Sequence, residues 1–179
     1  MKAFNFITQN SGKVAELQAK AHEFGLEIVQ VNAPYPELQA DTLEEVVRYG
    51  LSYCQERFPP PFIIEDSGLF IDDIHGFPGP YSSYVHRTIG NSGVVKLIGE
   101  GRPARFESAI GCYYRDFKLF HGRVEGCIVS SRGHRGFGFD PIFEYEGRTF
   151  GEMTVNEKNA LSHRSKAAEL FLEWASTII

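Results

Sequence analysis

The residues best suited to chemistry lie in the last third of the chain. Phe137 stands between two glycines, and an aromatic ring on so flexible a loop can stack on a base, a contact that contributes about 1–3 kcal/mol in nucleic-acid sites. His163 and Arg164 offer donors to an acceptor on a base edge, although a histidine there could also cap or pack near the last helix. With an acid and a lysine, these side chains suggest a nucleotide pocket made of Phe137, Gly138, Phe139, Asp140, Lys158, His163 and Arg164.

A second candidate is the turn between the first expected strand and the first expected helix. Free N–H groups and the positive end of the helix dipole favour an anion there, and Lys13 adds a full charge. The turn is not a P-loop, because the second glycine and the Lys-Ser/Thr ending are missing. The alternative is that Asn10 or Ser11 only caps the helix while Lys13 is solvated. As an anion site, the turn would use Thr8, Gln9, Asn10, Ser11, Gly12 and Lys13.

Two acidic segments could serve a metal ion or a water molecule. Asp66 comes at the end of an expected strand beside Ser67 and a glycine, where a carboxylate can hold a divalent cation or orient a water for attack on phosphorus. The same composition also makes an ordinary acidic turn. Glu37 follows a proline-stiffened loop and could complete a metal site with Asp66, but a surface glutamate is usually only solvated.

Length, charge and cysteine content narrow the kind of protein that carries these residues. A chain of 179 residues with 42% hydrophobic content fits one domain, which we place at residues 1–179. The net charge of −5 gives no basic field for DNA or RNA, so the expected partner is a small molecule. No apolar run approaches the roughly 20 residues that cross a bilayer, and no secretory pattern opens the chain, which predicts a cytoplasmic protein without membrane contact. Three cysteines without a C-x-x-C pair predict reduced thiols.

The elements that must position the candidate residues can be expected from periodicity. Buried strands are expected over residues 2–8 and 26–31, with a helix between them whose apolar residues recur from Val14 until Gly25 stops it. Capping-box spacing from Thr42 to Glu45 predicts a second helix that runs to about residue 57. A short strand over 62–64 is then expected to end at the acidic segment 65–68.

The second half of the chain predicts a different arrangement. Long β-rich runs over residues 104–114 and 117–130 surround a short polar turn and indicate an antiparallel hairpin. Residues 160–179, with Leu161, Ala168, Leu170, Phe171 and Trp174, show helical spacing that predicts one closing helix. The expected class is therefore α/β with a mixed sheet.

Five ordered motifs identify a family that the chain resembles over nearly its whole length. The chain is similar to the inosine triphosphate pyrophosphatases, also called Ham1-type proteins. Its segment Tyr81-Ser82-Ser83-Tyr84-Val85 looks most like the sequence of archaeal members. The motifs are Thr8-x-Asn10-x-x-Lys13 with Glu16, Glu65-Asp66-Ser67-Gly68-Leu69, Gly76-Phe77-Pro78-Gly79-Pro80-Tyr81-Ser82, Gly136-Phe137-Gly138-Phe139-Asp140-Pro141, and Thr149-Phe150-Gly151-Glu152-Met153 running into Glu157-Lys158-Asn159 and Ser162-His163-Arg164.

The resemblance implies an activity and a shape. The activity is hydrolysis of the deaminated purine nucleotides ITP, dITP and XTP to the monophosphate and pyrophosphate with Mg²⁺, which clears them from the nucleotide pool. The implied fold is an elongated mixed β-sheet with flanking helices that form two lobes around a central cleft, usually in a homodimer.

The resemblance also implies roles by position. By resemblance, Asp66 corresponds to the general base of the family, and Asp66 and Glu37 correspond to its metal ligands. Ser67 would lie beside the substrate. Thr8, Asn10 and Lys13 are similar to triphosphate ligands. Phe137 resembles the stacking aromatic, with Gly138, Phe139 and Asp140 completing that wall, Lys158 facing the nucleotide, and His163 with Arg164 reading the base.

Two other classes of protein stay open at this point. A related fold serves Maf-type pyrophosphatases, which act on other nucleotides, often pyrimidine or modified ones, and the Ser162-His163-Arg164 motif argues against them. A nucleotide sensor could keep the pocket without turnover, but a sensor needs no positioned base such as Asp66.

Overall fold

The strands of the computed structural model, which describes residues 2–36 and 38–178, form one eight-stranded mixed sheet. The strand order is β2-β1-β3-β5-β6-β7-β8, with β4 placed beside β3. The pairs β1–β2 and β1–β3 are parallel, and the other pairs are antiparallel. The strands are β1 (Lys2–Ile7), β2 (Leu26–Val31), β3 (Phe62–Ile71), β4 (Pro78–Gly79), β5 (Arg102–Tyr113), β6 (Phe117–Ile128), β7 (Phe143–Tyr145) and β8 (Arg148–Thr149).

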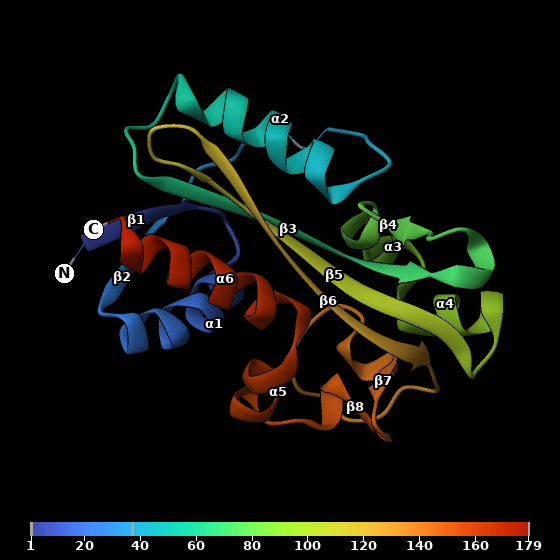
Figure 1. Ribbon diagram of the computed structural model, residues 1–179. Helices are drawn as coiled ribbons and strands as arrows, with labels where there is room; N and C mark the ends of the chain where they lie inside the picture. The colour runs from blue at the N-terminus through green and yellow to red at the C-terminus, as the bar shows by residue number, and fades with distance from the viewer. Residues whose placement is uncertain (1, 37, 179) are drawn as a thin grey trace.

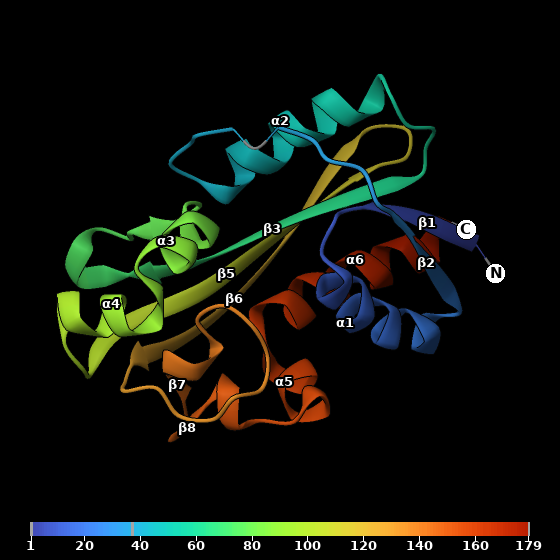
Figure 2. The same cartoon turned by 180° about the vertical axis from the view of Figure 1, so that it is seen from behind.

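In the described part of the chain, six α-helices lie around this sheet (Figure 1). Helices α1 and α6 lie together on one face, while α2 covers the opposite face of the long strands (Figures 1 and 2). Helices α3 and α4 lie at the far end of β3 and β5, on the side away from β1 and β2. The helices are α1 (Ser11–Ala21), α2 (Leu43–Gln55), α3 (Ser82–Thr88), α4 (Gly90–Ile98), α5 (Val155–Leu161) and α6 (His163–Thr177), and short 3₁₀ turns occupy residues 22–24, 72–74, 140–142 and 150–152.

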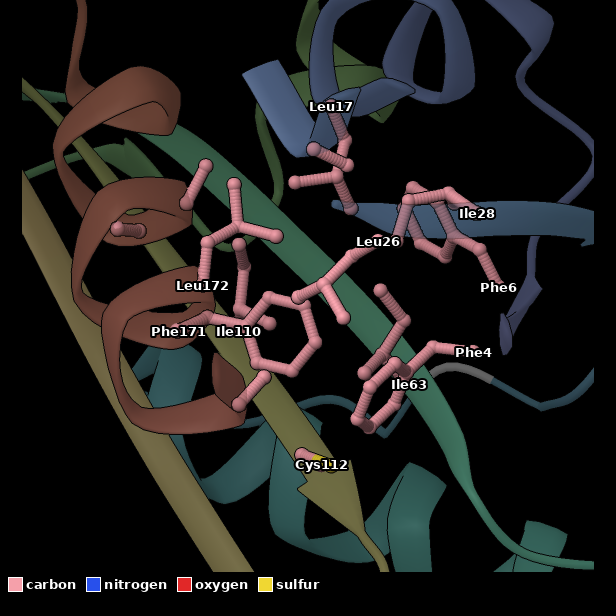
Figure 3. Close-up of a cluster of buried hydrophobic side chains, with 14 residues drawn as sticks. Phe4, Phe6, Leu17, Leu26, Ile28, Ile63, Ile110, Cys112, Phe171 and Leu172 are labelled. Carbon is pink, nitrogen blue, oxygen red and sulfur yellow. The ribbon is translucent and has the colours of Figure 1, made fainter. Parts of the chain in front are cut away.

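Two apolar layers hold α1, α2 and α6 against the part of the sheet that contains β1, β2 and the start of β3, which we call the first lobe. Alternation along the strands sends Ile63 toward α1 and α6, and sends Phe62 and Ile64 toward α2. In Figure 3, Phe171 and Leu172 of α6 face the strands that carry Ile110 and Ile63. Burial of these side chains on both faces fixes the start of β3 between α2 on one side and the pair α1 and α6 on the other.

The second lobe has a separate apolar cluster. It joins the far ends of β3, β5 and β6 to α3, α4 and the segment from residue 139 to residue 153. The long strands β3, β5 and β6 therefore run from one lobe into the other (Figure 1). This arrangement confirms the expected α/β class with an elongated mixed sheet and two lobes.

Several local expectations are confirmed by the geometry. Asn10 is the N-cap of α1, and its side chain accepts a hydrogen bond from the backbone of Lys13. Gly25, with φ of 69°, ends the turn that follows α1 in the left-handed region that favours glycine. Thr42 and Glu45 form the predicted capping box of α2. The hairpin of β5 and β6 also forms.

The expected end of β3 was wrong. The strand does not stop at residue 64 but continues through the acidic segment to Ile71. It continues because β5 pairs with it along its whole length, from Phe62 opposite Tyr113 to Ile71 opposite Ala104. Pairing with a long partner outweighs the turn composition of Asp-Ser-Gly, so the acidic residues lie inside a strand.

The single closing helix was also wrong, because the structure has two helices there. Ser162 has extended backbone angles, which separate α5 from α6. The hydroxyl of Ser162 accepts a hydrogen bond from the backbone of Ser165, so it caps the second helix. The break places His163 and Arg164 in the first turn of α6, and α5 begins earlier than expected, at Val155.

Two further expectations concern membranes and thiols. Within residues 2–36 and 38–178, no helix is both long and apolar enough to cross a bilayer. Cys54, Cys112 and Cys127 are free thiols, the first two of them buried, as expected for cysteines that serve as small apolar residues.

Close packing between β6 and α6 makes Gly122 a sensitive position. A Cβ atom added there would lie 2.0 Å from the backbone oxygen of His163 and 2.5 Å from the backbone nitrogen of Ala167. We therefore expect Gly122→Ala to move the start of α6 and to lower the free energy of unfolding by about 1–3 kcal/mol in urea titrations. Glu125→Ala, on the same strand with an exposed side chain, should change it by less than about 0.5 kcal/mol. Equal stabilities for the two variants would contradict this packing.

Candidate functional site

A cleft of about 410 Å³ opens between the two lobes, beside the middle of β3. On the edge of β3 that faces away from β5, β1 pairs only with Phe62 and Ile63, and β4 pairs only with Leu69 and Phe70. Of the residues between these pairs, 65–68 line the cleft. The cleft thus lies at the carboxyl end of β1, where parallel strands commonly present ligand sites.

The open edge brings side chains from both faces of β3 to one cleft. Alternation places Glu65 and Ser67 on the face of α1 and α6, and Asp66 on the face of α2. All three line the cleft. Gly68 permits the close approach of β4, since a Cβ atom there would lie 2.3 Å from the backbone oxygen of Gly79.

A buried carboxylate, Glu65, joins two cations of the cleft. Its Oε2 lies 2.8 Å from Nζ of Lys13, and its Oε1 accepts from Nε of Arg164 at 3.1 Å. The hydroxyl of Ser108, on the adjacent strand β5, donates to the same Oε1 at 2.6 Å. Burial would raise the pKa of Glu65, but Arg164 and Lys13 overcome this and hold its pKa well below the usual range. Glu65 is therefore ionised at neutral pH.

The pattern of alternating charges continues from Arg164 to the aromatic loop. Nη1 of Arg164 donates to Glu16 at 2.6 Å, and Nζ of Lys158 lies 3.3 Å from the other oxygen of Glu16. Lys158 also donates to Oδ2 of Asp140 at 2.7 Å, and the same oxygen accepts from the backbone of Phe137 at 2.8 Å. We call this row of side chains, Lys13, Glu65, Arg164, Glu16, Lys158 and Asp140, the charge ladder.

Asp140 fixes the loop that carries the exposed aromatic ring. Burial raises the pKa of Asp140, against the opposing effect of the Lys158 ammonium. Phe137 is 39% exposed, and its ring centroid lies 4.7 Å from Nζ of Lys158 and 5.1 Å from Cζ of Arg164. These distances are those of cation–π contacts. The ring also lies beside the start of α1, 3.6 Å from the Cβ position of Gly12. The expected aromatic platform is thus held by the charge ladder.

His163 lines the cleft from the first turn of α6. It is buried and stacks on Phe106, with ring centroids 4.6 Å apart and planes 13° apart. Burial and the neighbouring Arg164 hold the pKa of His163 well below its ordinary value, so the imidazole is neutral. Its buried Nδ1 has no hydrogen-bond partner among the described residues. His163 therefore packs near the last helix, as one interpretation predicted. It also lines the cleft, where it can contact a ligand.

The first turn, residues 8–13, contributes unevenly. Thr8, Gln9, Asn10 and Lys13 line the cleft, while Ser11 and Gly12 are absent from its described lining. The capping role of Asn10 is real, but Lys13 is not merely solvated, because it reaches both the backbone oxygen and the carboxylate of Glu65. Gly138, Phe139, Asp140 and Lys158 line the cleft as well.

The two predicted metal ligands are Asp66 and Glu37. Asp66 lines the cleft, whereas Glu37 lies outside the described residues. The described part of the chain contains no cluster of three or more His, Cys, Asp or Glu side chains arranged to hold a metal ion. A divalent cation here would need ligands from outside these side chains, such as phosphate oxygens.

Sequence reasoning missed Glu65, Glu16 and the wall supplied by α3. Both glutamates lie inside recognised motifs, but a charged residue in a strand or helix gives no sign that it is buried between cations. The α3 wall, with Ser82, Ser83, His86 and Arg87, lines the cleft as well. The edge contact of His86 with Phe139, at 5.3 Å between centroids, ties this wall to the aromatic loop.

The charges around the cleft balance within the described residues. Four cations line it, namely Lys13, Arg87, Lys158 and Arg164. Glu65, Asp66 and Asp140 line it as well, and Glu16 pairs with two of the cations from behind. When all are ionised, the described side chains provide no net positive charge for a polyanionic ligand.

Comparison with known proteins gives one consistent result. A family model described as the Ham1 family matches residues 4–174. The chain is 54% identical to a dITP/XTP pyrophosphatase of Pyrococcus horikoshii, over 97% of this chain and 96% of that one. It is 49% identical to a dITP/XTP pyrophosphatase of Thermococcus kodakarensis, over 94% and 95% of the two chains.

Solved structures agree with the fold. The Staphylococcus aureus Ham1 protein superposes with a TM-score of 0.86 at 23% identity, over 99% of this chain and 100% of that chain. A HAM1 protein from Coxiella burnetii gives a TM-score of 0.85 at 26% identity, with the same coverage.

The buried, neutral state of His163 predicts a stability change in acid. The unfolded chain binds a proton at this residue below pH 6.5 and the folded protein does not, so stability decreases as pH falls below about 6.5. His163→Phe keeps a ring in the stack and removes the titration. Its free energy of unfolding, measured between pH 7 and pH 5, should fall less steeply than the wild-type value, by up to about 1.4 kcal/mol per pH unit. The exposed His121→Gln control should keep the wild-type slope, and an unchanged slope in His163→Phe would refute the neutral state.

Proposed function

The chain belongs to the Ham1 family, and we propose that it is a nucleoside-triphosphate pyrophosphatase that hydrolyses dITP, ITP and XTP to the monophosphate and pyrophosphate. The shared activity name of its curated relatives supports this substrate class. The observation that carries the proposal is the placement of Arg164 beside the exposed ring of Phe137, inside a cleft that also contains Lys13. Such a protein removes deaminated purines from the nucleotide pool.

Arg164 is the proposed reader of the base. Its guanidinium has five N–H groups, and contacts with Glu65, Glu16 and Ser67 use one N–H on each nitrogen. One N–H on each terminal nitrogen remains for a ligand. Hypoxanthine and xanthine offer an O6 acceptor to these donors, whereas adenine presents an amino group that would leave them unpaired. Phe137 stacks on the base, and Lys158 and the neutral His163 complete the wall.

The phosphates are proposed to bind at the opposite end, near Lys13. Thr8 and Asn10 lie with it at the start of α1, where backbone N–H groups and the helix dipole favour an anion. Asp66 is the proposed general base. Its place on β3 between two paired segments allows it to accept a proton from a water that attacks phosphorus, with Ser67 beside the substrate.

Mg²⁺ is the proposed cofactor, with Asp66 and Glu37 as its protein ligands. The charge balance of the cleft supports a divalent cation, because a triphosphate carries close to four negative charges at neutral pH and the described side chains add no net positive charge. Mg²⁺ commonly uses one or two carboxylates together with substrate phosphates, which fits a site without a cluster of three protein ligands. When bound, the ion would offset phosphate charge during attack.

The remaining proposals concern the setting of the reaction. We place the activity in one domain that spans residues 1–179, in a cytoplasmic homodimer that acts on free nucleotides rather than on nucleic acid. The net charge of −5 supports the choice of free nucleotides.

Asp66→Asn separates an enzyme from a nucleotide sensor. If Asp66 accepts the proton, this variant should release pyrophosphate from dITP about 10²–10⁴-fold more slowly than wild type, while it still binds dITP. Pyrophosphate release and dITP binding, both measured with Mg²⁺, provide the two readouts. The exposed Asp41→Asn control should match wild type in both. A wild-type protein that binds dITP tightly without turnover would support the sensor instead.

A further inference from the structure

Glu65 is the member of the charge ladder that joins a cation at the start of α1 to a cation at the start of α6. It lies 2.8 Å from Nζ of Lys13, at the start of α1, and 3.1 Å from Nε of Arg164, at the start of α6. Its side chain is 1% exposed, so solvent does not screen either contact. Each oxygen thus has a different cation, and the two cations belong to different helices.

We propose that Glu65 is a positioning residue that couples phosphate binding at Lys13 to base recognition by Arg164. The proposal rests on the function given above, because it assigns the phosphates to Lys13 and the base to Arg164. Glu65 itself contacts neither part. It acts through the two cations that do.

The surroundings of Glu65 hold its carboxylate in place. Residue 65 lies opposite Ile110 in the continuous β3–β5 ladder, so its backbone is fixed on one side. The hydroxyl of Ser108, on β5, donates to Oε1 at 2.6 Å and orients the carboxylate. A carboxylate fixed in this way can serve as a reference point for two long, flexible side chains.

Arg164 depends on that reference point for the direction of its free donors. Glu65 binds the Nε edge of the guanidinium, while Glu16 and Ser67 bind the two terminal nitrogens. Because the guanidinium is planar, three fixed contacts determine the directions of the two N–H groups that remain. Discrimination between an O6 acceptor and a 6-amino donor requires those directions to be well defined.

Lys13, the proposed phosphate ligand, contacts the same carboxylate as Arg164 does. When a phosphate binds Lys13, the ammonium of Lys13 interacts with the phosphate and with Oε2 of Glu65 at the same time. This sharing changes the electrostatic attraction between Glu65 and Arg164. Linkage requires the effect to be reciprocal, so base recognition alters phosphate affinity by the same factor. Glu65 is unsuited to the role of general base, because both of its oxygens are already bound by cations.

Glu65→Gln weakens this coupling with little change in shape. The amide oxygen can still accept from Arg164 and Ser108, but the amide nitrogen would meet the ammonium of Lys13 donor to donor. We expect kcat/KM for dITP to fall about 10–100-fold, as for the loss of a hydrogen bond to a charged group, and the dITP to dATP ratio of kcat/KM to fall about tenfold. Ser108→Ala, which loosens Glu65 without removing its charge, should move both quantities in the same direction by about threefold to tenfold.

The control for charge is Glu107→Gln, on β5 outside the cleft lining, where the carboxylate pairs with Arg105 at 2.6 Å. It should keep the wild-type ratio. If Glu65→Gln and Ser108→Ala both lower dITP and dATP turnover equally and leave the ratio unchanged, Glu65 is structural only and the proposal is wrong. If Glu65→Gln fails to fold, the ratio of Ser108→Ala decides.

The same ratio can be measured as dITP and dATP affinities by calorimetry. This second readout does not depend on turnover. A wild-type protein that discriminates in binding but hydrolyses neither nucleotide would count against the proposed function alone. An affinity ratio that Glu65→Gln leaves at its wild-type value would overturn the coupling.

Discussion

The structure depends on the ion pairs that hold the cations of the cleft, because these cations lie in a wall that is largely buried from solvent. Isolated buried charges are strongly unfavourable, and they persist only when they are paired and hydrogen-bonded. Here every cation of the charge ladder lies between carboxylates or beside one, and the row ends at the backbone of Phe137. Because neighbours in the row share their contacts, removal of any member takes an ion-pair partner from each of its neighbours.

The fold can be understood as the support for that row. Long strands that pass through both lobes give β3 a fixed position, and the missing neighbour along residues 64–68 opens its edge to the cleft. Helices α1 and α6 pack together on one face, so Lys13 and Arg164 reach Glu65 from adjacent helix starts (Figure 2). The break at Ser162 matters because an uninterrupted helix would carry Arg164 on a later turn, away from this meeting point.

The sequence predicted the parts whose causes are local. The capping box at Thr42, the glycine stop at Gly25 and the hairpin all follow from short-range patterns, and they are present. The sequence motifs contain most of the residues that line the cleft, from Thr8 to Arg164. A motif shows that residues are adjacent in the sequence, however, and does not show on which face of a strand or helix each residue lies.

The missed features have causes that lie far apart in the chain. The length of β3 is set by its pairing with β5, and the role of Glu65 is set by partners 52 and 99 residues away. A sequence shows Glu65 and Asp66 as an acidic pair, whereas strand alternation sends them to opposite faces with separate surroundings. The start of α6 was detectable in principle, since Ser162 precedes Ser165 at N-cap spacing, but the helical periodicity across it concealed the break.

The most direct test of the central claim is pyrophosphate release from a panel of ITP, XTP, dITP, ATP, GTP, CTP and dUTP, with Mg²⁺ present and then chelated. The account predicts rapid release from ITP, XTP and dITP that is lost on chelation, with far slower release from the other four nucleotides. Release mainly from the pyrimidine nucleotides, or release that persists without a divalent cation, would contradict it.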